Sequence, residues 1–173
     1  MAAARLAPPT RPTPRGPTAL ALASAGLALA GVAVWGLCAC VPVLGLIAFW
    51  PVPVDRGAAT YLNRWLRQLH RWGVPPWFDY GVVEFSSNVV LFAPLGALVA
   101  IILGRRLWWG GAVAGFMLST VIELGQMAFL PARFPSAADV AANTIGAMAG
   151  ALAARLFMAR REAVRSRRPP RTL

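Results

Sequence analysis

The feature that most constrains this chain is a run of 31 residues, from Leu20 to Trp50, that contains no charged side chain. A helix of that length measures roughly 46 Å at about 1.5 Å per residue, whereas one membrane crossing needs about 20 residues. The run therefore predicts a single long or tilted membrane helix, with Pro42 as a candidate kink. It is too long for the apolar region of a cleaved secretory signal, which has about 7 to 15 residues.

Three further apolar segments follow, with predicted bounds of about 84–104, 107–130 and 138–158. The whole chain is 58% apolar and 13% charged, whereas a soluble domain carries about 25% charged residues. Because the connections between the three segments are short, we expect them to be antiparallel neighbours. We therefore predict an all-α fold, a polytopic membrane helical bundle with four transmembrane helices.

A short amphipathic helix is predicted in the loop after the first span. Apolar side chains recur there at Leu62, Trp65, Leu66, Leu69 and Trp72, and polar or arginine side chains fill the opposite face. This period and its tryptophans predict a helix that lies in the membrane interface. A solvated loop helix that packs on the bundle is the alternative.

Basic tails flank the predicted membrane domain, which extends over residues 19–158. Residues 1–18 are rich in proline and arginine without an apolar period, so we expect them to be disordered. Residues 159–173 form a second basic tail, predicted to be cytoplasmic. The net charge is +11, but the arginines gather at the ends of the apolar runs. They are therefore interpreted as topology signals, and no nucleic-acid partner is expected.

The distribution of arginine predicts the orientation of the chain. Four spans place both termini on the same side, together with the turn that contains Arg105 and Arg106. That side holds eleven arginines outside the predicted spans, and the other side holds five. The positive-inside rule then places both termini in the cytoplasm.

The few polar residues of the last three spans fall near the opposite, outer face. Ionisable groups are costly inside a bilayer, so they are functional candidates by default. They occur in pairs three or four residues apart, which puts both members of a pair on one face of a helix. We predict that these pairs and one loop arginine form a polar, ligand-binding cluster. Its members are Glu84, Asn88, Glu123, Gln126, Arg133, Asp139 and Asn143.

Structural explanations compete with this interpretation. Polar side chains also hold membrane helices together, at about 0.6 kcal/mol per interhelical hydrogen bond. Asp139 is a candidate N-cap of the last span, aided by Ser136, and Gly146 and Gly150 form a G-x-x-x-G pattern for close helix packing. Three carboxylates exceed what packing needs, which favours a pocket. No catalytic residue, metal site or cofactor is predicted, because no nucleophile–base pair, metal-ligand set or phosphate-binding loop is recognisable.

Three motifs of the chain resemble those of the VanZ-like family of small bacterial membrane proteins. They are Asn-Val-Val-Leu-Phe-Ala-Pro-Leu-Gly at 88–96, Ile-Glu-Leu-Gly-Gln at 122–126, and a third that extends over residues 133–147. The resemblance covers roughly residues 84–150 and implies four or five helices in the bacterial cytoplasmic membrane. Family members often have an acidic residue where this chain has Ser136, which weakens a metal-binding interpretation. The family positions carried over are Asn88, Pro94, Gly96, Glu123, Gln126, Arg133, Asp139, Asn143 and Gly146.

The resemblance also implies a link to the cell envelope, because the family's namesake is associated with resistance to the glycopeptide antibiotic teicoplanin. We expect a role in envelope maintenance or antibiotic tolerance, through an outer-leaflet pocket for an amphiphile. Membrane lipids and a lipid-linked wall precursor or lipoglycopeptide are the expected partners. Two alternatives stay open: a non-catalytic helical partner in an envelope complex, with possible homo-oligomers, and a lipid-modifying enzyme with a carboxylate as general base.

Overall fold

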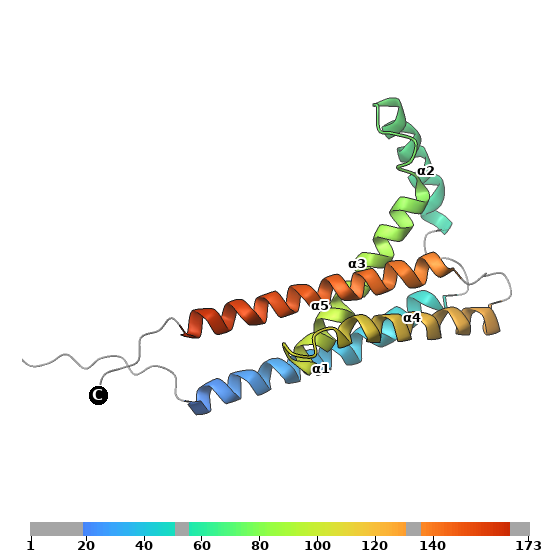
Figure 1. The fold of residues 1–173 in the computed structure, drawn as a ribbon. Coiled ribbons are helices and arrows are strands. Elements are labelled where there is room, and N and C mark those ends of the chain that lie inside the picture. The colour runs from blue at the N-terminus through green and yellow to red at the C-terminus, as the bar shows by residue number, and fades with distance from the viewer. Residues whose placement is uncertain (1–18, 51–55, 131–135, 167–173) are drawn as a thin grey trace, which may run out of the picture.

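The computed structural model describes residues 19–50, 56–130 and 136–166, which form five helices (Figure 1). Four of these helices are long and apolar enough to cross a membrane, and the part of the chain described contains no strand. The prediction of an all-α bundle with four transmembrane helices and one short additional helix is therefore confirmed. The helices are α1 (Ala19–Ala48), α2 (Arg56–Arg71), α3 (Tyr80–Leu103), α4 (Gly110–Phe129) and α5 (Ala137–Ser166).

The bundle is built around α3, α4 and α5, which all contact one another, and α1 packs mainly on α3. Figure 1 shows that the start of α1 and the end of α5 lie at one end of the bundle. The short helix α2 lies at the other end and runs across the direction of α4 and α5. Because three reversals connect the four long helices, the first helix starts and the last helix ends at the same end of the bundle. The end that carries α2 is called the α2 end below.

Local capping sets the bounds of α3. The carboxylate of Asp79, directly before the helix, accepts a hydrogen bond of 3.2 Å from the backbone N–H of Val82. The helix ends at Gly104, whose φ of +79° is rarely adopted by residues with a side chain. The predicted start at Glu84 was therefore too late by one turn, because Asp79 allows the helix to begin at Tyr80.

The helix α5 continues to Ser166, although the last span was predicted to end at residue 158. Arginine is a strong helix former, so a basic segment does not by itself end a helix. The guanidinium of Arg155 also lies 5.0 Å from the ring centre of Trp108, and Glu162 forms an ion pair of 3.4 Å with Arg105. These contacts fix α5 against the turn between α3 and α4. The predicted tail at 1–18 lies outside the described residues.

The helices α3 and α5 touch along a seam of glycines. A Cβ atom on Gly96 would overlap the carbonyl oxygen of Ala147, and one on Gly146 or Gly150 would overlap a carbonyl oxygen of α3. The two backbones are therefore in direct contact, which confirms the close packing predicted from the G-x-x-x-G pattern. Two clusters of buried apolar side chains accompany the seam: Leu44, Phe92, Leu95, Ile122 and Ala147, and separately Ala100, Ala151 and Ala154.

Candidate functional site

A cavity of about 740 Å³ lies at the α2 end, and all five helices contribute residues to its lining. Its volume is within the range of about 300–1,000 Å³ that is typical of small-molecule sites. Arg133 lies outside the described residues. That the cavity binds a ligand stays a prediction. The other six predicted site residues all line it: Glu84, Asn88, Glu123, Gln126, Asp139 and Asn143.

The wall of the cavity is strongly apolar on the side of α1 and α3. Leu44 and Ile47 come from the last turns of α1, and Leu91 and Phe92 come from the middle of α3. Apolar and polar side chains therefore face one space. A cavity of this composition suits a molecule that has a polar head and an apolar body.

Asn88 and Asp139 join α3 to α5 across the cavity. The Asn88 side-chain amide donates a hydrogen bond of 3.0 Å to the Asp139 carboxylate. Asp139 lies in the first turn of α5, where the helix dipole stabilises negative charge. The cap of α5 is Ser136, whose hydroxyl oxygen accepts a 3.2 Å bond from the backbone N–H of Asp139. The suggestion that Asp139 caps the helix was therefore wrong, because its side chain bonds to α3.

Glu123 is a buried carboxylate, with 7% of its surface exposed. Its Oε2 atom accepts a hydrogen bond of 2.8 Å from the backbone N–H of Ser136, directly before α5. The first N–H groups of a helix have no partner within it and carry partial positive charge. Glu123 therefore satisfies a donor at the start of α5, and the helix stabilises the carboxylate in return.

Gln126 has the matching role at the end of α1. Its side-chain amide donates a hydrogen bond of 2.8 Å to the backbone carbonyl of Ala48, the last residue of α1. The last carbonyls of a helix lack intrahelical partners, and an unsatisfied one inside a membrane costs several kcal/mol. Gln126 thus allows α1 to end beside the cavity and links it to α4.

Asn143 is the most deeply buried polar residue of the lining, with 6% of its surface exposed. Its amide nitrogen donates a hydrogen bond of 2.8 Å to the hydroxyl oxygen of Ser119 on α4, which is fully buried. Its Oδ1 atom is buried and has no hydrogen-bond partner among the described residues. Ser119 was not predicted as a member of the cluster. Its spacing of four and seven residues from Glu123 and Gln126 was the signal that could have identified it.

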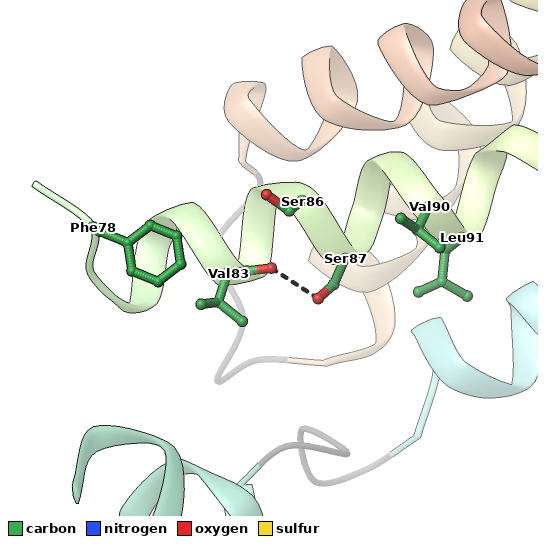
Figure 2. Close-up of a pocket in the computed structure, with 6 residues that line it drawn as sticks. All are labelled: Phe78, Val83, Ser86, Ser87, Val90 and Leu91. Atoms are coloured by element: carbon green, nitrogen blue, oxygen red, sulfur yellow. Dashed lines mark hydrogen bonds between the residues drawn. The ribbon is translucent and has the colours of Figure 1, made fainter. Parts of the chain in front are cut away.

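Glu84 and Ser87 lie where the cavity opens, and both side chains are exposed. Ser87 donates a hydrogen bond of 2.8 Å to the carbonyl of Val83 in its own helix, so it bridges no helices through that contact. Figure 2 shows Ser87 and the adjacent Ser86 on different sides of α3. Ser87 lines the cavity described above, whereas Ser86 does not.

A second, smaller cavity of about 450 Å³ follows the outer face of α3 (Figure 2). It shares Val83, Ser87 and Leu91 with the larger cavity, so the two are adjacent. Its remaining lining residues are Phe78, Ser86 and Val90, and it contains none of the predicted site residues.

The residues of the larger cavity are compatible with both interpretations that sequence analysis treated as alternatives. The hydrogen bonds of Asn88, Glu123, Gln126 and Asn143 reach a neighbouring helix or its end, as a structural role requires. The same side chains also face a space large enough for a ligand. No group of three or more potential metal ligands occurs within the described ranges.

Comparison with known proteins identifies the family. The family model VanZ/LLP1 matches residues 41–158, which contain every residue that lines the larger cavity. No curated protein and no solved structure matches the chain. The matched range exceeds the resemblance at 84–150, since it includes the end of α1 and the whole of α2. Because the match extends over more than half of the sequence, this membrane protein belongs to the VanZ/LLP1 family.

Proposed function

We propose that this protein binds an amphiphile in the outer leaflet of the bacterial cytoplasmic membrane, as part of cell-envelope maintenance or tolerance to glycopeptide antibiotics. One observation carries the proposal: polar residues from three helices and an apolar wall line a single cavity of about 740 Å³. A lipid-facing bundle needs no such space for stability alone. The amphiphile in this proposal is a lipid-linked wall precursor or a lipoglycopeptide, each of which has a polar head and an apolar chain.

The outer-leaflet location rests on the arginine distribution. Arg105 and Arg106 lie in the turn between α3 and α4, at the end of the bundle away from α2, and the basic segment of α5 lies at that end as well (Figure 1). The positive-inside rule assigns this end to the cytoplasm. The cavity at the α2 end then opens near the extracytoplasmic surface.

A pair of adjacent serines allows a direct test in cells. In a strain that lacks the gene, we would express the wild type, the Ser87→Trp variant and the Ser86→Trp variant, and measure teicoplanin tolerance. The indole at position 87 would fill the cavity, and it would break no interhelical hydrogen bond described for Ser87. The indole at position 86 would lie outside the cavity and serves as the matched control.

We expect Ser87→Trp to lose tolerance at a normal membrane level of protein, and Ser86→Trp to keep it. Full tolerance with Ser87→Trp would contradict a function of the cavity. Equal loss in both variants would indicate that a bulky residue on α3 acts through folding. A gene deletion with unchanged teicoplanin tolerance and unchanged envelope integrity would contradict the envelope role itself.

A further inference from the structure

The charged side chains in the described lining of the larger cavity are all carboxylates. Its carboxylates, Glu84, Glu123 and Asp139, accept hydrogen bonds and donate none when ionised. None of the described residues in the lining is a lysine, arginine or histidine. Among these residues, a head group that enters the cavity therefore meets carboxylates and no cationic side chain.

Each side-chain amide of the lining has one N–H bonded to the protein. The side-chain nitrogens of Asn88, Gln126 and Asn143 donate to Asp139, to the carbonyl of Ala48 and to Ser119, respectively. Each of these bonds joins two helices. These bonds fix the orientation of each amide, so its nitrogen has at most its second N–H for a ligand.

Asn143 supplies an independent indication of the ligand's chemistry. It is more than nine-tenths buried, it lines the cavity, and its Oδ1 atom has no hydrogen-bond partner within the described part of the chain. A buried acceptor without a partner costs about 1–3 kcal/mol, and the cost is regained when a donor reaches it. Because the bond to Ser119 fixes the orientation of the amide, Oδ1 is the atom of Asn143 for which the described structure supplies no partner.

We propose that the cavity recognises a head group rich in hydrogen-bond donors, the hydroxyls of a sugar or an ammonium group, and that Asn143 accepts one of these donors. This inference rests on the proposed function, and it narrows the amphiphile to one whose head donates hydrogen bonds. A head group that offers only phosphate oxygens is disfavoured, because both it and the lining present acceptors.

The test uses amphiphiles that share one chain and differ in the head group. The full-length protein is placed in phosphatidylcholine nanodiscs, because the choline head group has no N–H or O–H donor. Equilibrium binding of radiolabelled dodecyl glucoside, dodecylamine, dodecyl phosphate and permethylated dodecyl glucoside is then measured. We expect the glucoside, the amine or both to bind roughly three- to tenfold more tightly than the permethylated glucoside, as one additional buried hydrogen bond implies.

Two variants separate recognition from helix bridging. Asn143→Leu removes both the bridge to Ser119 and the acceptor, whereas Ser119→Ala removes the same bridge and leaves the Asn143 oxygen in place. We expect Asn143→Leu to abolish the preference for donor head groups and Ser119→Ala to retain it. Equal loss of preference in both variants would overturn the role of Asn143, because bridging alone would then explain the effect.

The outcomes also distinguish this inference from the proposed function. Saturable binding in which dodecyl phosphate is the tightest ligand would overturn the proposed preference for donor head groups. The proposal that the cavity binds an amphiphile would still hold. Equal affinity for the glucoside and its permethylated form, with no preference for the amine, would also overturn the proposed preference for donor head groups. If no probe bound saturably, the proposed function would fail together with this inference. A preference for the amine over the glucoside would assign the donor to an ammonium group, and the reverse would assign it to a sugar.

Discussion

The side-chain amide of Asn88 on α3 lies 3.0 Å from the carboxylate oxygen of Asp139 on α5, to which it donates a hydrogen bond. The two residues are 51 positions apart in the sequence and face one cavity. Each therefore stabilises the fold and shapes the candidate site at once. Experiments on this protein have to measure stability and binding separately.

The energy of this contact can be measured with a double-mutant cycle of Asn88→Ala and Asp139→Ala. We expect a coupling energy of about 0.6–1.7 kcal/mol, between the mean and the largest value found for hydrogen bonds between membrane helices. Unfolding of the purified protein in mixed micelles would provide the four stabilities. The cycle of Asn88→Ala with Thr120→Ala is the control, since the Thr120 hydroxyl bonds to the carbonyl of Phe116 in its own helix. A coupling energy near zero for the first pair would show that this hydrogen bond contributes no stability.

Glu123 should tolerate the loss of its charge better than the loss of its acceptor. Glu123→Gln keeps an oxygen for the N–H of Ser136 and removes the charge interaction with the helix dipole, which contributes about 0.3–2 kcal/mol. Glu123→Leu leaves that N–H without this acceptor, which adds about 1–3 kcal/mol. Unfolding free energies and hydrogen exchange at the amide of Ser136 would distinguish the two variants. Equal effects would mean that the charge, and not the hydrogen bond, is what Glu123 contributes.

The glycine seam predicts a severe effect from one methyl group. Gly150→Ala places a Cβ atom against the carbonyl of Ala93, so we expect destabilisation by at least about 1–3 kcal/mol, the cost typical of overpacking. Gly31→Ala is the matched control, because the space around Gly31 in α1 is open and alanine favours the helix. Thermal unfolding in detergent checks both variants. If the two behaved alike, α3 and α5 would not be in direct backbone contact.

The proposed orientation predicts opposite labelling of two acidic positions. Glu84 and Glu162 are both exposed, and they lie at opposite ends of the bundle. In a background of Cys38→Ala and Cys40→Ala, a membrane-impermeant maleimide should label the Glu84→Cys variant in intact cells. The Glu162→Cys variant should react only after permeabilisation. The reverse pattern would place both termini outside the cytoplasm and the cavity in the inner leaflet.

Much of the fold could be predicted because bilayer thickness constrains length and composition together. The uncharged run from Leu20 to Trp50 required a span, and α1 occupies most of it. The helix α5 continues to Ser166, beyond the predicted end of the last span at about residue 158. Arginine forms helices well, and the stacking of Arg155 on Trp108 shows how its long side chain covers apolar surface at a helix end.

The membership of the cluster was more predictable than its hydrogen bonds. Helical spacing placed each polar pair on one face, and six of the residues do line one cavity. Their partners depend on how far each helix rotates about its own axis, which periodicity along one helix does not determine. For this reason the bond of Gln126 to the end of α1, and that of Asn143 to Ser119, could not be predicted.

The glycine seam between α3 and α5 sets how closely these two helices approach each other beside the cavity. Asn88 precedes Gly96 by two helical turns on α3, and Asn143 precedes Gly146 by about one turn on α5, so the polar residues extend the same line of approach. The distance between the polar residues of α3 and α5 at the cavity is therefore set by the close contact of the two backbones at the glycines. A related chain that carried alanine at these positions would be expected to present the same polar residues around a wider, differently shaped opening.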